Sequence, residues 1–438
     1  MSDAETLAQP ITTPEDASFG VCIHRGTQQI GGTCIELACQ GSRILLDLGL
    51  PLDSGDTDPA SLLPAIAGLN EADPSLLALV LSHGHADHWG LAPYAKVKLS
   101  IVAGAATRRI MRAAAAFVPR AIPHGTENDD APDLEDRKPL RIGPFTITPF
   151  LVDHSAFDAY ALLVEAGGRR LFYSGDLRAH GRKAALFERL VAHPPPSIHA
   201  MLMEGSSLGR LAPDQVFPTE DDIEAQFADR FRTPGFVGVC ASAQNIDRVV
   251  SLYRACKRTG RTLLLDLYAL EVLAATGKAS IPGAHWDNVA VYVPEHQRRH
   301  IARTKQFELL DRHKLHRIYR DTLAPMASRA VMLFRPTMMR DIDLMAGAWK
   351  GARMIWSQWS GYLPSETNLR FQENLAERGV TLEVIHTSGH ASIPDLKRLA
   401  AAIAPDVLVP VHTFKGDRFP GLFGTSVVLR ADNEWWEV

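Results

Sequence analysis

The chain has 438 residues, a formal net charge of −4 and 46% hydrophobic residues. These values predict a globular protein with one large or two to three ordinary domains, and they exclude a globally basic nucleic-acid-binding surface. No apolar run is long enough to predict a membrane span, and residues 1–17 predict no secretory signal. The five cysteines form no C-x-x-C pair, which favours a reducing, cytoplasmic compartment.

The first fifty residues predict a loose tail at 1–19 followed by short strands and glycine turns. The apolar run at 44–49 predicts a strand that contains Asp47. A carboxylate in such a run needs a polar partner. Composition favours an ordinary turn residue at the strand end, and a partner for a histidine is the alternative.

The most informative stretch is the H-x-H-x-D-H motif, which follows an apolar run at 77–81 that predicts a buried strand. Imidazole nitrogens and carboxylates are ligands suited to zinc, and crowding them without a metal would leave buried polar groups without partners. One histidine would favour a solvated turn, whereas four ligand-type residues in six positions favour a metal site. These residues are His83, His85, Asp87 and His88.

Later strands also end in polar, ligand-type residues. After a predicted helix at 105–118 and a polar loop at 121–143, apolar runs at 145–152, 170–174 and 201–203 precede His154, Asp176 and Glu204. Taken singly, His154 favours a core or loop histidine and Asp176 a turn aspartate. Their shared position at strand ends favours a common site.

The character of the sequence changes after Gly209. A strand at 236–240, a helix at 245–258 that stops at Gly260 and a strand at 262–266 form a β-α-β unit. Such a unit predicts a parallel sheet in a second domain. Further strands are predicted at 288–293, 330–334 and 352–356.

Residues 298–320 hold eleven Lys, Arg or His residues and form the strong basic cluster of the sequence. A solvated helix face is the common explanation for such a run. The alternative is an electrostatic track for a nucleic acid, with Trp356, Trp359 and Tyr362 as stacking platforms. The sequence leaves both open.

The C-terminal part returns to the earlier pattern. An apolar strand within 382–390 leads to His390, and a strand at 407–411 is followed by His412. Between them, Ser392 and Asp395 predict a capping box that begins a helix. The chain thus predicts one α/β unit that is interrupted by an inserted domain and then completed.

Together these motifs resemble the metallo-β-lactamase fold, and in particular its β-CASP subgroup. The metal motifs of that fold are matched by residues 82–88, His154 and residues 175–176, over a resemblance that spans about residues 20–415. The subgroup's three further motifs are matched by Glu204, residues 388–392 and residues 410–412. The subgroup contains ribonuclease J, the cleavage and polyadenylation endonuclease and DNA-repair relatives.

The resemblance implies an α/β protein, an αββα sandwich with an inserted β-CASP α/β domain. The implied units are residues 1–206 and 376–438 for the sandwich and 207–375 for the insert. It also implies two Zn²⁺ ions, with Mn²⁺ as an alternative metal. One ion would be held by His83, His85 and His154, the other by Asp87, His88 and His412, with Asp176 as the bridge.

The resemblance assigns roles to further residues. Catalytic roles go to Asp87, His390 and Glu204, with His390 protonating the leaving oxygen or binding a phosphate. Asp47 and Glu204 would each hold a metal-ligating histidine. The implied substrate-binding residues are Ser388, Gly389 and Ser392.

The implied activity is hydrolysis of single-stranded RNA by a hydroxide that bridges two metals, as an endonuclease, a 5′-exonuclease or both. A DNA nuclease and a hydrolase of a small ester, thioester or phosphodiester are the alternatives. A non-catalytic binding module is disfavoured because every expected ligand type is present. Ribonuclease J commonly forms a homodimer through an extra C-terminal domain, but this sequence ends about 25 residues after His412, where Thr413-Phe414-Lys415 replaces a frequent Gly-Glu.

Overall fold

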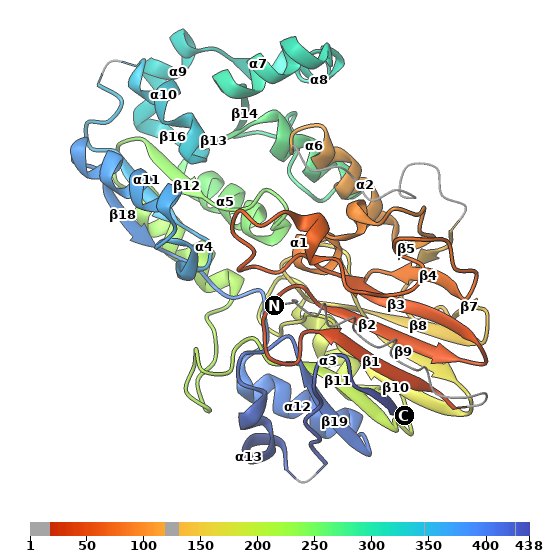
Figure 1. The fold of residues 1–438 in the computed structure, drawn as a ribbon. Helices are drawn as coiled ribbons and strands as arrows, with labels where there is room; N and C mark the ends of the chain where they lie inside the picture. Colours follow the sequence, from red (N-terminus) through yellow and green to blue (C-terminus); the bar gives the residue numbers. More distant parts are fainter. Residues whose placement is uncertain (1–17, 119–130, 346, 425) are drawn as a thin grey trace, which may run out of the picture.

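The computed structural model describes residues 18–118, 131–345, 347–424 and 426–438, whose strands form three sheets (Figure 1). Nearly all of the predicted tail at 1–19 and much of the predicted loop at 121–143 lie outside the described residues. No helix in the described part is long and apolar enough to cross a membrane. All five cysteines are buried and unpaired.

Two sheets pack face to face. Sheet 1 runs in the order β20 (Trp435–Glu437), β1 (Gly20–Arg25), β2 (Cys34–Cys39), β3 (Ser42–Leu48), β4 (Leu76–Val80), β5 (Ile101–Gly104) and β6 (Asp133–Leu134). Sheet 2 runs in the order β19 (Val407–Val411), β11 (Ala200–Glu204), β10 (Arg169–Tyr173), β9 (Ala159–Ala166), β8 (Phe145–Val152) and β7 (Leu140–Ile142). Alternate residues of each strand face inward, so Ile35, Leu37, Leu162 and Leu202 meet in one core.

Helices cover the outer faces of these two sheets. Met111 of α2 (Ala105–Ala115) packs on sheet 1, where the short α1 (Ala86–Trp89) follows β4. On sheet 2 lie α3 (Ala184–Ala192) and α12 (Ile393–Ile403), whose buried residues share one cluster with that sheet, and α13 (Phe419–Phe423) packs beside them. The layers are therefore helix, sheet, sheet, helix, which confirms the predicted αββα sandwich.

Sheet 3 is parallel throughout and is built from the middle of the sequence. Its order is β15 (Arg317–Ile318), β14 (Val289–Tyr292), β13 (Thr262–Leu265), β16 (Ala330–Leu333), β12 (Val237–Cys240), β17 (Arg353–Trp356) and β18 (Thr381–Val384). The predicted β-α-β unit is present as β12, α5 (Ile246–Thr259) and β13. As predicted, α5 ends at Gly260, whose positive φ of 66° suits glycine.

Helices also cover both faces of sheet 3. One face carries α4 (Glu220–Phe231), α5, α6 (Leu267–Ala275), α7 (Glu295–Thr304) and α8 (Glu308–Asp311). The other carries α9 (Arg320–Met326), α10 (Met339–Asp343) and α11 (Glu366–Glu377). Buried residues of β16 alternate between the two helical layers, as the two-residue period of a strand requires.

One predicted boundary needs correction. The sequence assigned 376–438 to the sandwich, but Thr381–Val384 pairs in parallel with Arg353–Trp356. The strand therefore belongs to sheet 3, and the chain returns to the sandwich only after Val384. With that change, the division of the chain into a sandwich and an inserted domain stays our proposal.

Candidate metal centre

The predicted ligand residues converge because they follow strands whose carboxyl ends lie at one edge of the sandwich. His83 and His85 lie in the turn between β4 and α1, and Asp87 and His88 lie in α1 itself. The others follow β8, β10 and β19, and they are His154, Asp176 and His412.

These side chains form two neighbouring groups of potential ligands, and a third group brings Asp176 together with Glu204 and His390. The first comprises His83, His85 and His154, and the second comprises Asp87, His88, Asp176 and His412. Within each group the ligand atoms lie within 4.8 Å of one another. The Oδ2 atom of Asp176 lies 3.1 Å from His88 Nε2, 3.6 Å from His412 Nε2 and 3.9 Å from His83 Nε2. Asp176 is thus placed between the groups, where the resemblance puts a bridging ligand.

The donor set fits divalent cations. Asp176 Oδ1 and His412 Nε2 are buried and have no hydrogen-bond partner among the described residues. Burial holds the pKa of His83 and of His154 well below the usual value, so both imidazoles are neutral, as metal ligation requires. Burial acts to raise the pKa of Asp176, but His412 and His88 outweigh it and hold that pKa well below its usual value. Neutral imidazoles at His83 and His154, together with the ionised Asp176, are ligands suited to a metal ion, whereas Asp176 and Asp47 outweigh burial at His88 and raise its pKa well above the usual value.

Asp47 holds His88 in place. Asp47 Oδ2 lies 2.8 Å from His88 Nδ1 and accepts hydrogen bonds of 2.8 Å from the hydroxyls of Ser82 and Tyr173. The carboxylate therefore fixes the ring and leaves Nε2 directed at Asp176. Asp47 has a φ of 60°, a left-handed conformation that costs free energy in a non-glycine residue and is often found at functional sites.

Two further ligand histidines are oriented through Nδ1. His154 Nδ1 lies 2.5 Å from the carbonyl oxygen of Gly389, and His412 Nδ1 lies 2.8 Å from the Thr33 hydroxyl. In both rings Nε2 is then the nitrogen available to a metal. His412 is also left-handed, with a φ of 51°.

His390 pairs with Glu204. His390 Nδ1 lies 2.9 Å from Glu204 Oε2 and 3.8 Å from Asp176 Oδ2, and the side chain is 18% exposed. Burial acts to lower the pKa of His390, but the charges of Glu204 and Asp176 raise it above its usual value. Glu204 is predicted to hold a metal-ligating histidine, but its carboxylate contacts His390, which lies outside the predicted ligand set.

The three predicted substrate-binding residues are engaged within the protein. Ser392 is fully buried, and its hydroxyl caps α12 through Asp395 as the sequence predicted, so it is removed from the substrate-binding set. The carbonyl of Gly389 holds His154, and a Cβ on Gly389 would lie 2.6 Å from Ser155 Oγ. The Ser388 hydroxyl accepts from the His390 amide at 3.0 Å. Ser388 and Gly389 thus shape the site, and their contact with a substrate stays a prediction.

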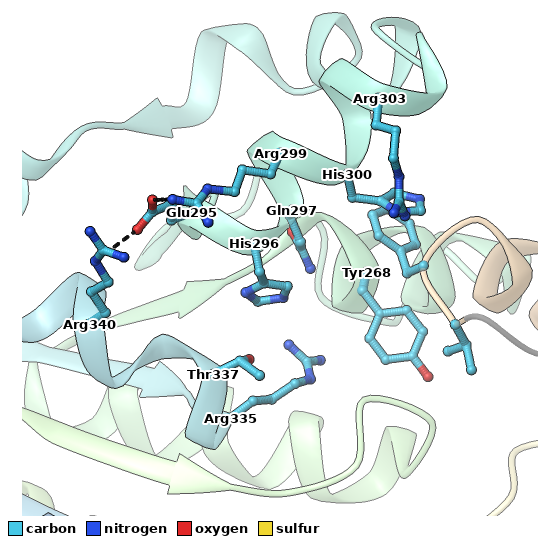
Figure 2. A pocket seen from close by; sticks show the side chains of 12 residues that line it. Tyr268, Glu295, His296, Gln297, Arg299, His300, Arg303, Arg335, Thr337 and Arg340 are labelled. Atoms are coloured by element: carbon cyan, nitrogen blue, oxygen red, sulfur yellow. Dashed lines mark hydrogen bonds and ion pairs between the residues drawn. The ribbon is translucent and has the colours of Figure 1, made fainter.

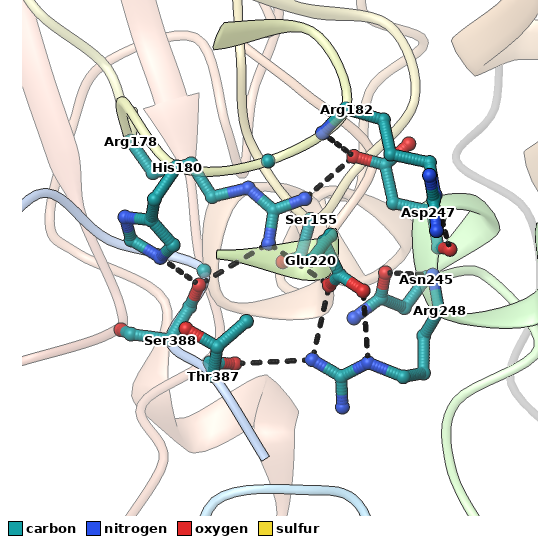
Figure 3. Close-up of polar contacts among 12 residues, drawn as sticks. Ser155, Arg178, His180, Arg182, Glu220, Asn245, Asp247, Arg248, Thr387 and Ser388 are labelled. Atoms are coloured by element: carbon teal, nitrogen blue, oxygen red, sulfur yellow. Dashed lines mark hydrogen bonds and ion pairs between the residues drawn. The ribbon is translucent and has the colours of Figure 1, made fainter. Parts of the chain in front are cut away.

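Figure 3 shows a second buried polar cluster, which includes Arg178, Glu220 and Arg248. The fully buried Arg178 donates to Asp153 at 3.2 Å, to Asp247 at 2.6 Å and to the carbonyl of Ser388 at 3.2 Å. Glu220 accepts from Arg248 at 3.0 and 3.2 Å. We call Asp153, Arg178, Glu220, Asp247 and Arg248 the buried ion network. It ties the sandwich to the helices of sheet 3 and holds the segment that leads to His390.

The predicted aromatic platforms have different positions. Trp356 is 2% exposed and belongs to the core of sheet 3, so it is not a platform. Trp359 and Tyr362 are exposed, with ring centroids 5.2 Å apart, and the guanidinium of Arg210 lies 4.4 Å from the Trp359 ring. Partial burial and then the charge of Asp87 raise the pKa of Tyr362, so the Tyr362 hydroxyl lies within electrostatic range of one member of the second ligand group.

The basic segment at 298–320 is not one helix face. It is divided among α7, α8, a 3-10 turn, β15 and the start of α9. Arg312 and His313 pair with Glu271 at 3.0 and 2.9 Å. Arg299, His300 and Arg303 instead line a cavity. The solvated-face explanation therefore accounts for only part of the segment.

Sequence reasoning missed Thr33, Tyr173 and Arg178. Each acts through a partner far away in the sequence; Thr33 and His412, for example, are 379 positions apart. No local pattern marks such a residue. For Arg178, the one sequence signal is its place two positions after the strand-end residue Asp176.

Comparisons with known proteins agree with this geometry. A family model described as a beta-lactamase superfamily domain matches residues 43–193. Ribonuclease J of Sinorhizobium meliloti is 22% identical over 403 residues, covering 84% of this chain and 63% of that protein. Ribonuclease J of Mycobacterium tuberculosis is 26% identical over 252 residues, covering 54% and 42%. An RNase J-like protein of Methanocaldococcus jannaschii is 26% identical over 164 residues, covering 35% of each chain.

Each of these matches covers less than two thirds of the relative's own length. Among solved structures, a protein of unknown function from Enterococcus faecalis has a TM-score of 0.77 at 20% identity, covering 96% of this chain and 100% of that chain. That likeness shows the shared fold alone.

Proposed function

The chain has the metallo-β-lactamase fold and is of the β-CASP, ribonuclease J-like type, and from this premise we propose that it is a metal-dependent phosphodiesterase that hydrolyses RNA. The observation that carries the proposal is the pair of ligand groups around Asp176, in which Asp176 Oδ1 and His412 Nε2 have no partner among the described residues. Buried polar atoms need partners. Two divalent ions, which we propose to be Zn²⁺ with Mn²⁺ as a substitute, would complete them.

Metal ions at such a site would neutralise the charge of a phosphodiester and lower the pKa of an attacking water. The protein's own residues keep the ligand atoms in place. Asp47, Thr33 and the Gly389 carbonyl fix three rings, so little reorganisation is needed when substrate binds.

We assign proton donation to His390. Glu204 raises the pKa of His390, which favours the protonated ring, and it holds Nδ1, so the other nitrogen, Nε2, is left to donate a proton to a leaving oxygen. The partial exposure of His390 gives it access to substrate, whereas Glu204 is fully buried and acts through His390. Asp87, predicted to be catalytic, is 15% exposed and belongs to the second ligand group.

The rim of the site supports a polynucleotide substrate. Arg210, Trp359 and Tyr362 offer one cation and two exposed aromatic rings, and the charge of Asp87 acts on Tyr362. Nucleobases stack on such faces, with about 1–3 kcal/mol per base. Hydrolysis of a small ester, thioester or phosphodiester is the second candidate, because the metal ligands alone suit it equally well.

The test is incubation of the metal-loaded protein with single-stranded RNA and DNA of one sequence, labelled at either end. Internal cuts or a ladder from the 5′ end of RNA support the proposal and tell endonuclease from exonuclease. If DNA is cleaved in preference to RNA, DNA is the substrate. Asp176→Asn should abolish cleavage, while the exposed Asp229→Asn is the matched control. Intact RNA and DNA alongside hydrolysis of a small ester would favour the second candidate.

A further inference from the structure

A cavity of about 580 Å³ is lined mainly by residues of the part of the chain folded around sheet 3 (Figure 2). Its walls come from α6, from α7, from the segment after β16 and from Phe117 and Val118, which follow α2. None of its lining residues belongs to either ligand group. The cavity is therefore a separate candidate site.

The position of the cavity follows from the topology of sheet 3. Its lining residues Tyr268, Glu295 and Arg335 come soon after β13, β14 and β16, which are neighbours in the sheet. From β13 the chain moves to β14 on one side, and from β16 it moves to β17 on the other. Ligands of open parallel sheets bind outside the carboxyl ends of the strands, where neighbouring strands lead the chain in opposite directions. The cavity lies at that point.

The lining is strongly positive. Four arginines line the cavity, and the one lining carboxylate is Glu295. Glu295 lies 2.5 Å from Arg299 and 3.5 Å from Arg340, so it offsets part of their charge. Arg303 lies 3.2 Å from His300 Nδ1 and has no carboxylate partner among the described residues. The arrangement favours an anion.

Two buried polar atoms in the cavity wall have no partner in the described part of the chain, Arg335 Nη2 and His296 Nδ1. Arg335 is fixed in place, because Nη1 contacts Asp266 and the guanidinium lies 4.9 Å from the Tyr268 ring centroid. Asp266 is held in turn by Gln297 at 2.8 Å. A preordered guanidinium with a free N–H suits a phosphate oxygen.

Aromatic rings complete the site. Phe117 and Tyr268 lie with ring centroids 5.7 Å apart, and the Tyr268 hydroxyl accepts from Gln244 at 3.0 Å. Flat rings beside a positive wall match a ligand that has both an aromatic base and a phosphate.

We propose that this cavity binds a nucleotide, with its phosphate at Arg335 and Arg303 and its base against Phe117 and Tyr268. The nucleotide is either free or part of an RNA strand, and the two share this chemistry. The inference goes beyond the proposed function, because the cavity contains no metal ligand and binding there does not require cleavage.

The experiment measures the affinity of adenosine 5′-monophosphate, and of adenosine as the ligand without phosphate, by calorimetry. Arg335→Lys keeps a cation for Asp266 but removes the forked guanidinium, and Arg303→Ala removes an exposed arginine. Lys314→Ala is the control, since Lys314 belongs to the same basic segment but does not line the cavity. We expect each arginine variant to weaken nucleotide binding roughly tenfold, the control to bind like the unaltered protein, and adenosine to bind weakly throughout.

A second arm uses a 5′-phosphorylated oligoribonucleotide with the Asp176→Asn variant, in which cleavage is blocked. The cavity is assigned to an RNA strand if the arginine variants bind the oligonucleotide more weakly and if the slope of log affinity against log salt concentration falls by about one. Loss of mononucleotide binding alone assigns it to a free nucleotide. Unchanged binding of both ligands in both arginine variants overturns the inference. Cleavage by the unaltered protein is measured separately, so failure of the nuclease proposal is distinguishable from failure of this one.

Discussion

Two buried polar clusters adjoin one another in this protein, and consecutive residues belong to different ones. Asp153 lies in the buried ion network, whereas His154 lies in the first ligand group. In the network each guanidinium meets carboxylates, and Arg178 and Arg248 have no side-chain atom without a partner. In the ligand groups Asp176 Oδ1 and His412 Nε2 lack a partner among the described residues. The comparison indicates that a cluster whose polar atoms are paired stabilises the fold, whereas the cluster with unpaired ligand atoms could bind a cation.

Asp176→Asn should give the largest effect of all, because we propose that this one carboxylate bridges the metal ions of both ligand groups. Metal stabilisation of transition-state charge is worth several kcal/mol, so we expect at least ~10³-fold slower RNA cleavage. The measurement is single-turnover cleavage at saturating metal. Cleavage within tenfold of the unaltered rate would contradict the claim that the ligand groups, and not the buried ion network, support catalysis.

Glu220→Gln tests the other cluster, since it leaves Arg178 and Arg248 with less negative charge in a buried setting. Breaking a buried ion pair from one side costs about 3–5 kcal/mol of unfolding free energy, measurable by urea denaturation at pH 7. Metal content per folded chain should not change. Loss of metal without loss of stability would contradict the assignment of roles.

The stability lost in Glu220→Gln should depend on pH. Burial acts to raise the pKa of Glu220, but Arg248 and Arg178 outweigh it and lower the pKa from 4.5 to about 2. A lowered folded-state pKa gives stability that is fully present above about pH 4.5 and lost as the pH falls toward 2. The difference in unfolding free energy between the unaltered protein and Glu220→Gln should therefore shrink across that range. A constant difference would argue against an ionised Glu220.

His390→Gln should slow cleavage by about 10²-fold or more with metal content unchanged, since a proton donor is lost. His24→Gln is the matched control, because His24 pairs with Glu36 at 2.7 Å on sheet 1, away from the ligand groups. Cleavage should fall as pH rises through the pKa of His390. Glu204→Gln removes the charge that raises this pKa, so the falling limb of the pH profile should move to lower pH. If the falling limb of the pH profile of Glu204→Gln lies at the same pH as in the unaltered protein, His390 is not the proton donor.

Trp359→Ala should give the smallest effect, with single-stranded RNA binding weakened roughly tenfold through loss of one stacking surface. Its stability should be nearly unchanged, because Trp359 lies at the surface. Trp356→Ala is the contrast and should lose about 3–5 kcal/mol of unfolding free energy as a core cavity forms. Equal RNA affinity of Trp359→Ala and the unaltered protein would show that Trp359 does not contact the RNA.

The sequence predicted the parts of the fold whose signal is local. The β-α-β unit ending at Gly260 and the cap at Ser392 were visible because turn and cap chemistry occurs within a few residues. The strand Thr381–Val384 was assigned to the wrong sheet, because a short apolar run does not say which neighbour it will pair with.

The same limit holds for the site. His83, His85 and His88 were visible as one motif, and strand-end placement pointed to His154 and Asp176. Tyr173 and Thr33 were not visible, because only tertiary structure brings them to Asp47 and His412. Trp356 and Trp359 are three positions apart, and the composition of their segment does not show which is buried.

The most direct test of the central claim is the metal stoichiometry of the stripped and reconstituted protein, measured by elemental analysis after removal of free Zn²⁺. The two ligand groups predict two ions per chain in the unaltered protein and in Glu220→Gln, and fewer in Asp176→Asn. Fewer than one ion per chain in the unaltered protein would contradict the claim that the unsatisfied cluster is a metal centre.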